Sequence, residues 1–234
     1  MTKVGGSLSG LIHGVLLKRG GHNIRILERN STLLVSSQGA GLNAGPDVQQ
    51  FMREFDRTGL PYSLNPPTAK FMDSVGKVIR TMESDQRSTD WSTLYYRLRA
   101  NFDGLQTGYC EVPPGTERDG QALYMDGHSV SEVKYQHGHL TVDFHCPDGS
   151  IGSIETDLVI AADGPSSKVR QIMAPEVERK YVGYCGWRGT IPEYDLSEEA
   201  KTILNETITV CGIEKSFLTS FVLELITLIL NVYM

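Results

Sequence analysis

The sequence predicts an α/β fold that begins with a βαβ unit, carries an inserted antiparallel β-meander and ends in an incomplete α+β part. Three observations lead to this prediction. Apolar residues recur at helical spacing between two strand-like runs in residues 2–28. From residue 122 to 162 the apolar period changes to two, as in half-buried strands. An aromatic, strand-like segment then starts at Tyr181.

The βαβ unit occupies the first 28 residues. A strand stub at residues 2–4 leads into glycines, and Gly20-Gly21 ends the helix that follows. The apolar face of this helix consists of Leu8, Leu11, Ile12, Val15 and Leu16. The run Ile24–Leu27 is rich in β-branched residues and predicts a second strand that ends at Glu28.

Four elements are expected between this unit and the meander. They are a glycine-rich loop at residues 36–46, a helix capped by Asp47, a strand pair within residues 70–81, and a helix over 91–102 with Asp90 as its N-cap.

The meander contains a turn signal at Asp148-Gly149. Its last strand is the apolar run Leu158–Ala162, expected to be buried on both faces. A helix should start at Ser166-Ser167, and a charged helix should cover residues 196–204.

Composition restricts the class of protein. The 234 residues carry 22 Lys+Arg against 28 Asp+Glu, a formal charge of -6 without a basic block, which argues against nucleic acid as a partner. Four cysteines without a C-x-x-C pair indicate a reducing compartment, and the start does not resemble a signal peptide. We therefore expect a cytoplasmic protein without a metal site.

The segment 216–234 is almost entirely apolar, with Glu224 near its centre. A central carboxylate is costly in a lipid bilayer, so a membrane anchor is disfavoured. A buried or partner-seeking helix and the abnormal end of a truncated chain are the other interpretations. A partner contact or homodimer could form through this segment.

The first glycines approximate the dinucleotide-binding pattern G-x-G-x-x-G. The matching residues are Gly5, Gly6, Ser7 and Gly10, with serine in place of the middle glycine. Backbone amides near Ser7, Leu8 and Ser9 would face a diphosphate at the helix N-terminus. Glu28 follows Gly10 by 18 residues, where an acid accepts hydrogen bonds from an adenosine ribose. The alternative is a structural turn and a surface glutamate.

Asp163-Gly164 forms a second glycine turn between an apolar strand and a helix. It could lie near phosphate groups. Equally, Asp163 could cap the helix that follows.

Six segments together resemble the flavin-dependent aromatic hydroxylases of the para-hydroxybenzoate hydroxylase class. In chain order they are VGGSLSGL, IRILER, GAGL, WSTLYYRLRANFDG, DLVIAADGPSSKVR and YCGWRGTIPE. The resemblance implies a Rossmann-like FAD-binding domain and a monooxygenase that acts on a small aromatic or N-heteroaromatic ring. In such enzymes NADPH reduces FAD, and O2 then forms a flavin C4a-hydroperoxide that hydroxylates the ring.

The resemblance also assigns roles to residues. It places Gly5, Ser7, Leu8 and Ser9 along the FAD pyrophosphate, Glu28 on the ribose, Arg29 beside the adenosine, and Arg97 or Arg99 near the flavin chain. Asp163 and Gly164 would lie where the pyrophosphate and the incoming nicotinamide nucleotide meet. No catalytic residue is assigned.

The same resemblance implies a domain organisation. We expect residues 1–68 and 93–180 to form the FAD/NAD(P)-binding domain, residues 69–92 and 181–215 part of a substrate domain, and residues 216–234 an apolar tail. The first strand is short, and the Gly-Asp segment that holds the flavin in this class is not found. We therefore expect a truncated gene product.

Three functions remain open at this point. The first is the FAD-dependent monooxygenase, active or inactive through truncation. The second is an oxidoreductase that uses NAD(P) alone, and the third is a non-catalytic remnant that binds the ADP half of a dinucleotide.

Overall fold

The computed structural model describes residues 1–31, 41–63, 68–73, 77–83, 87–181, 184–198, 201, 207–211, 215–222 and 225–233. The chain divides into two compact units. Unit 1 contains Met1–Val35, Phe55–Gly59 and Tyr95–Arg179, and unit 2 contains Ser36–Glu54, Leu60–Leu94 and Lys180–Met234.

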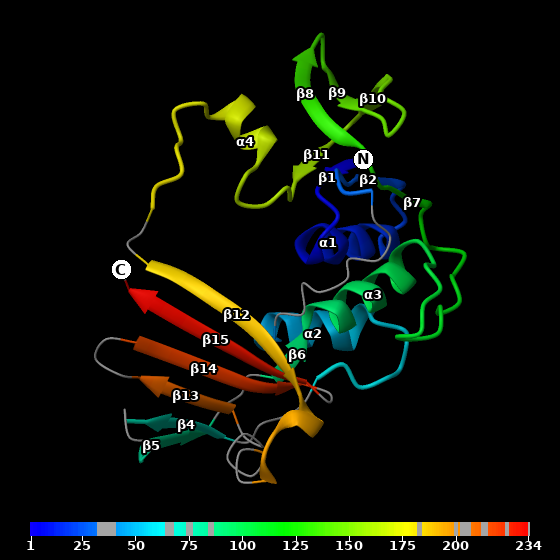
Figure 1. Cartoon of the computed structure of the whole chain (residues 1–234). Coiled ribbons are helices and arrows are strands. Elements are labelled where there is room, and N and C mark those ends of the chain that lie inside the picture. Colours follow the sequence, from blue (N-terminus) through cyan, green and yellow to red (C-terminus); the bar gives the residue numbers. More distant parts are fainter. Residues whose placement is uncertain are drawn as a thin grey trace. The chain divides into compact units, whose positions relative to one another are not determined.

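Unit 1 is built on a parallel sheet with the strand order β11-β1-β2-β7. Its strands are β1 (Thr2–Val4), β2 (Ile24–Leu27), β7 (Ala122–Met125) and β11 (Val159–Ala161). Helix α1 (Leu8–Arg19) connects β1 to β2 and packs against both, as Figure 1 shows. The predicted βαβ unit is therefore confirmed.

The two faces of this sheet are covered differently. Paired residues of parallel strands point to the same side, so Lys3 and Ile26 share one face with the helices. The opposite face contributes Val4 and Leu27 to a hydrophobic core with residues of the meander and of α4 (Lys168–Met173). The buried partners in that core are Val130, Val142, Phe144 and Val169.

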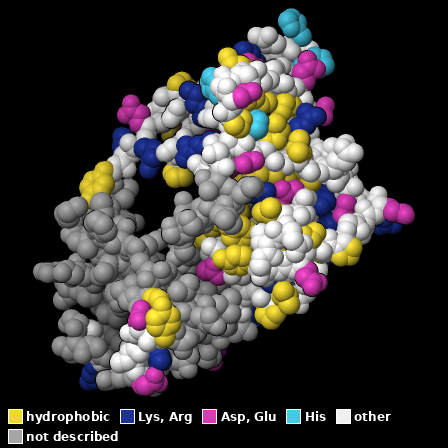
Figure 2. All heavy atoms as spheres, turned by 45° about the vertical axis from the view of Figure 1, so that its right-hand side comes forward, with side chains coloured by type: hydrophobic (Ala, Val, Ile, Leu, Met, Phe, Trp, Pro, Cys, Tyr) yellow, Lys and Arg dark blue, Asp and Glu magenta, His cyan; other side chains and the backbone are white. Residues whose placement is uncertain are grey.

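The meander consists of β8 (Ser129–Gln136), β9 (His139–His145) and β10 (Ile151–Thr156), paired antiparallel in the order β10-β9-β8. The turn at Asp148-Gly149 is confirmed, and Gly149 has a φ of 83° that favours glycine. Figure 2 shows acidic and basic side chains interspersed over the part of unit 1 that carries the meander.

The predicted limits of the meander were wrong. Residues at both of its ends, in β7 and β11, belong to the parallel sheet instead. The run ending in β11 is also not buried on both faces, because Leu158 is 40% exposed, Ala161 is exposed, and Val159 and Ile160 are half-buried.

Two further helices agree with the sequence. In α3 (Trp91–Phe102) the Asp90 carboxylate accepts a hydrogen bond from the Thr93 amide at 2.8 Å, so the predicted N-cap is confirmed. Helix α4 begins after Ser167, whose hydroxyl accepts a hydrogen bond from the Arg170 amide at 2.9 Å.

Unit 2 contains a six-stranded sheet with the order β12-β15-β14-β13-β4-β5. Its strands are β4 (Thr68–Met72), β5 (Val78–Glu83), β12 (Tyr184–Pro192), β13 (Thr207–Cys211), β14 (Lys215–Val222) and β15 (Leu225–Tyr233). The strand pair expected within residues 70–81 corresponds to β4 and β5. A short 3-10 helix, η1 (Glu193–Asp195), follows β12.

The helical interpretation of the apolar segment 216–234 was wrong. The described part of this segment forms β14 and β15, which pair with each other, and β15 also pairs with β12. Backbone pairing on both sides of β15 satisfies its polar groups, and its β-branched residues suit a strand. Among the described residues, no helix is long and apolar enough to cross a membrane.

The loop expected at residues 36–46 and the charged helix expected at 196–204 agree only in part with the structure. Of the loop expected at residues 36–46, the described Gly41–Ala44 forms β3, which pairs antiparallel with β6 (Arg87–Asp90). Helix α2 (Pro46–Phe55) then starts at a proline, which suits a first helical position. The charged helix at 196–204 lies largely outside the described residues, although the Lys201 amide bonds the Ser197 carbonyl at 2.9 Å.

Candidate dinucleotide-binding site

The candidate site lies at the carboxyl end of β1, where the chain turns into α1. Gly5 has a φ of 98°, and a Cβ built on it would lie 2.3 Å from the Ala162 carbonyl oxygen. Its amide donates to the Leu27 carbonyl at 2.9 Å. Gly5 therefore holds the ends of β1, β2 and β11 together in a way that no L-residue with a side chain could reproduce.

The other two glycines of the motif allow the same close approach. A Cβ on Gly10 would lie 2.0 Å from the Gly5 carbonyl oxygen, and one on Gly6 would lie 2.1 Å from the Tyr124 hydroxyl. Ser7, the N-cap of α1, is exposed, so the start of the helix faces outward. The amides of this first turn have no acceptor within the helix and suit an anion.

Glu28 lies within hydrogen-bond reach of the glycine turn. One carboxylate oxygen accepts a bond from the Gly6 amide at 2.8 Å, and the other accepts one from the Asn30 amide at 2.9 Å. An ionised carboxylate has about four acceptor positions, so two amide donors leave room for ribose hydroxyls. Arg29, the next residue, is exposed.

Tyr124 of β7 is a part of this site that sequence reasoning missed. Its hydroxyl donates to the Gly6 carbonyl at 3.0 Å and lies 3.2 Å from the Tyr95 hydroxyl. Burial, together with the Tyr95 contact, raises the pKa of Tyr124, so the phenol keeps its proton. The Arg99 guanidinium lies 3.6 Å from the centre of the Tyr124 ring. Tyr124 therefore links α3 to the glycine turn.

The two arginines of α3 have different surroundings. Arg99 bonds Tyr95 and Asp103, and it reaches the glycine turn through Tyr124. Arg97 forms a buried ion pair with Asp56, whose carboxylate also accepts a bond from the Asn101 amide group at 2.8 Å. The expected place of Arg97 or Arg99 near a flavin chain stays a prediction.

Asp163 caps α4 in the manner that the sequence left open. Its carboxylate accepts hydrogen bonds from the Ser167 hydroxyl at 2.6 Å and from the Lys168 amide at 2.7 Å. Gly164 has a φ of 75° and is exposed. The turn follows β11 directly and adjoins Gly5, because a Cβ on Gly5 would lie 2.8 Å from the Asp163 Cα. A role near phosphate groups stays a prediction.

Lys3 is the second feature that the sequence did not reveal. Its side chain is fully buried on the central strand β1, and its ammonium group lies 3.5 Å from the Ser9 carbonyl oxygen. Burial lowers the pKa of Lys3 to about 8. A charged group is thus enclosed directly behind the first turn of α1.

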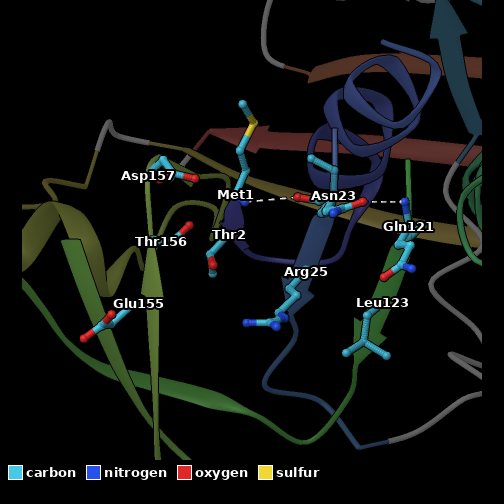
Figure 3. Close-up of a pocket in the computed structure, with 11 residues that line it drawn as sticks. Met1, Thr2, Asn23, Arg25, Gln121, Leu123, Glu155, Thr156 and Asp157 are labelled. Atoms are coloured by element: carbon cyan, nitrogen blue, oxygen red, sulfur yellow. Dashed lines mark hydrogen bonds between the residues drawn. The ribbon is translucent and has the colours of Figure 1, made fainter. Parts of the chain in front are cut away.

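A pocket of about 680 Å³ lies at the opposite end of the parallel sheet (Figure 3). Arg25, Glu155 and Asp157 surround it, and the Asn23 carbonyl accepts a bond from the Met1 ammonium at 3.0 Å. Ligands of open α/β sheets bind at the carboxyl ends of the strands, whereas this pocket is at the amino ends. It is therefore separate from the glycine turn.

Solved structures share this fold. The 2,6-dihydroxypyridine-3-hydroxylase from Arthrobacter nicotinovorans aligns with a TM-score of 0.77 at 21% identity, over 99% of this chain and 55% of that chain. CtdE in complex with FAD and a substrate aligns with a TM-score of 0.79 at 16% identity, over 100% of this chain and 57% of that chain. The fold is thus that of FAD-binding hydroxylases, as the sequence predicted.

Particular curated relatives are also found, although no family model matches the chain. The 2,6-dihydroxypyridine 3-monooxygenase of Paenarthrobacter nicotinovorans is 26% identical over 213 residues, 88% of this chain and 46% of its own length. The 6-hydroxynicotinate 3-monooxygenase of Pseudomonas fluorescens is 29% identical over 198 residues, 81% of this chain and 46% of its own length. The chain is homologous to these monooxygenases and spans about half their length.

Replacing Gly10 by alanine tests the close packing at the turn. Alanine inside a helix normally stabilises by about 1 kcal/mol relative to glycine. At Gly10 the new Cβ meets a backbone oxygen, so we expect the free energy of unfolding to fall by about 1–3 kcal/mol in denaturant titrations. Gly108→Ala is the control, since a Cβ there meets nothing within 4 Å. An equal effect in both variants would contradict the packing argument.

Replacing Lys3 by methionine tests the cost of the buried ammonium group. Below pH 8 the folded protein holds this charge at a cost of as much as about 3 kcal/mol. Between about pH 8 and 10.5 the unfolded chain binds the proton more tightly, so the stability of the wild-type protein should rise with pH. We expect Lys3→Met to be more stable at pH 7 and to lose this rise. Thermal melting over pH 7–10.5 measures both effects, and parallel curves for the two proteins would refute the assignment.

Proposed function

We propose that this chain binds the ADP half of FAD at the glycine turn and serves an FAD-dependent, NAD(P)H-using monooxygenase of an aromatic or N-heteroaromatic ring. The observation that carries the proposal is the hydrogen bond between the Gly6 amide and the Glu28 carboxylate. It joins the two parts of the dinucleotide motif, one for the diphosphate and one for the ribose, in a single site. The homology to heteroaromatic monooxygenases supports the reaction class.

The residues present fit the ADP half. Gly5, Gly6 and Gly10 allow the tight turn and the close packing of α1 on the strand ends that bring the helix N-terminus to the diphosphate position, and Ser7 is a small residue where the diphosphate would approach. The first-turn amides near Ser7, Leu8 and Ser9 would donate to its oxygens, helped by the positive end of the α1 dipole. Glu28 would accept hydrogen bonds from the ribose hydroxyls. Exposed Arg29 would lie beside the adenosine.

In such an enzyme FAD, once reduced by NADPH, supplies the activation of O2 for ring hydroxylation. The chain's own contribution is to orient the dinucleotide. Tyr124 and Arg99 hold the Gly6 carbonyl in place from the side of α3. Asp163-Gly164, adjoining Gly5, would border the approach of the nicotinamide nucleotide.

Titration of the purified protein with FAD, followed between 350 and 500 nm, tests the proposal. We expect flavin bands that remain with the protein through gel filtration, and oxidation of NADPH in the same sample if the flavin ring is held productively. Retention of FAD without NADPH oxidation would support the ADP-half site and refute turnover by this chain alone. Tight binding of NADP with no retention of FAD would instead favour the NAD(P)-only oxidoreductase.

Substituting glutamine for Glu28 tests the ribose contact. Glutamine has one acceptor oxygen where the carboxylate has two, so ribose hydroxyls must compete with the Gly6 and Asn30 amides. We expect FAD to bind about tenfold more weakly, which corresponds to one charge-assisted hydrogen bond. Glu155→Gln, in the pocket at the other end of the sheet, should leave the affinity unchanged. Equal FAD affinities of Glu28→Gln and the wild-type protein would remove Glu28 from the site.

A further inference from the structure

Lys3 is a charged side chain in a place that normally holds an apolar one. It lies on the central strand β1 between Ile26 of β2 and Ile160 of β11, its partners in register, and none of its surface is exposed. Its contact with the Ser9 carbonyl, at 3.5 Å, is long for an ammonium group, since charge-assisted bonds are about 2.7–2.9 Å. The same carbonyl is contacted at 2.7 Å by Nδ1 of His13.

Other charged groups on the neighbouring elements are engaged elsewhere. Arg25 of β2 is exposed on the opposite face of the sheet, and Lys18 and Arg19 bond partners at the far end of α1. The carboxylates of Glu28 and Asp163, which follow β2 and β11, accept the bonds described above. Within the described part of the chain, Lys3 takes part in no ion pair. The ammonium group is thus buried, and no counter-ion to it lies among the residues that the structure describes.

The position of this charge relative to the turn is specific. Ser9 belongs to the first turn of α1, which begins at Leu8 after the exposed N-cap residue Ser7. The ammonium group therefore lies behind the helix N-terminus, and its field adds to that of the helix dipole. An anion bound in front of the turn would interact with Lys3 through a region of low dielectric, where charges act strongly.

We propose that Lys3 is a further binding residue of the dinucleotide site, a buried cation that attracts the diphosphate through the first turn of α1 and takes up a proton when the diphosphate binds. This inference rests on the proposed function. It gives a reason for a destabilising charge beneath the turn. The free energy lost by burying the ammonium group is offset by its attraction to the two negative charges of a bound diphosphate.

The pKa of Lys3 sets the range in which the effect can be seen. Burial lowers it to about 8, so the amine of the unliganded protein is mostly charged at pH 7 and mostly neutral at pH 9.5. A bound diphosphate must raise this pKa, because an opposite charge favours the protonated form. Affinity should therefore fall as the pH rises, and binding at pH 8 should take up protons.

Isothermal titration of the full chain with ADP-ribose tests the inference, because this probe keeps two negative diphosphate charges over the whole range. We expect the Kd to rise about tenfold from pH 7 to 9.5, the change produced by a shift of one pKa unit. The observed heat at pH 8 should differ between buffers of different ionisation enthalpy. Lys3→Met should bind about tenfold more weakly at pH 7, with a Kd that does not depend on pH.

Two controls separate this effect from general changes. Adenosine, which lacks the diphosphate, should bind the wild-type protein equally at both pH values. Lys134→Met removes a partly exposed lysine of β8 and should keep the wild-type pH profile. If Lys3→Met does not fold, the proton uptake of the wild-type protein decides.

The outcomes distinguish the inference from the function on which it rests. Binding of ADP-ribose without proton uptake, or with the same pH profile in Lys3→Met, would overturn the role of Lys3 and leave the dinucleotide site intact. Failure of ADP-ribose and FAD to bind either protein would overturn the proposed function, and the role of Lys3 with it.

Discussion

The site depends on the absence of side chains at the junction of β1 and α1. A Cβ on Gly10 would lie 2.0 Å from the Gly5 carbonyl, and a Cβ on Gly5 would lie 2.3 Å from the Ala162 carbonyl. Only bare backbone lets the helix begin directly on the ends of three parallel strands. These two close contacts hold the first turn of α1 beside the end of β2, where the Glu28 carboxylate accepts a hydrogen bond from the Gly6 amide. The buried amine of Lys3 lies 3.5 Å from the Ser9 carbonyl of the same helix turn.

Electrostatics at this junction are arranged in layers. The outer layer consists of the first-turn amides with the Glu28 carboxylate beside them, and the inner layer is the buried ammonium of Lys3. The neutral Tyr124 hydroxyl donates a hydrogen bond to the Gly6 carbonyl. The Arg99 guanidinium of α3 lies over the Tyr124 ring and is itself paired with Asp103. In the proposed function this arrangement would favour an anion in front of α1, whereas the polar pocket at the other end of the sheet carries charges of both signs.

Local patterns predicted the parts of the fold that local forces decide. The βαβ unit, the Asp90 cap and the Asp148-Gly149 turn follow from spacing and from turn chemistry. Strand partners could not be predicted in this way, so β7 and β11 were assigned to the meander. A helix was one of the interpretations of the segment 216–234, although its strand β15 pairs with β12. An apolar run suits either structure, and distant strands decide between them. Tyr124 and the burial of Lys3 were missed for the same reason, because both depend on the neighbours of β1 and β2.

The hydroxyl of Tyr124 meets the carbonyl of Gly6 across 118 residues of sequence. Contacts of such long range require closure of a large loop before they contribute any stability, and they form slowly. The glycine turn also packs against the Ala162 carbonyl, so a ribosome must release the chain through β11 before this turn can take its final shape. The amino-terminal glycine turn is therefore made first during synthesis but is completed only after the later strands β7 and β11 have been added.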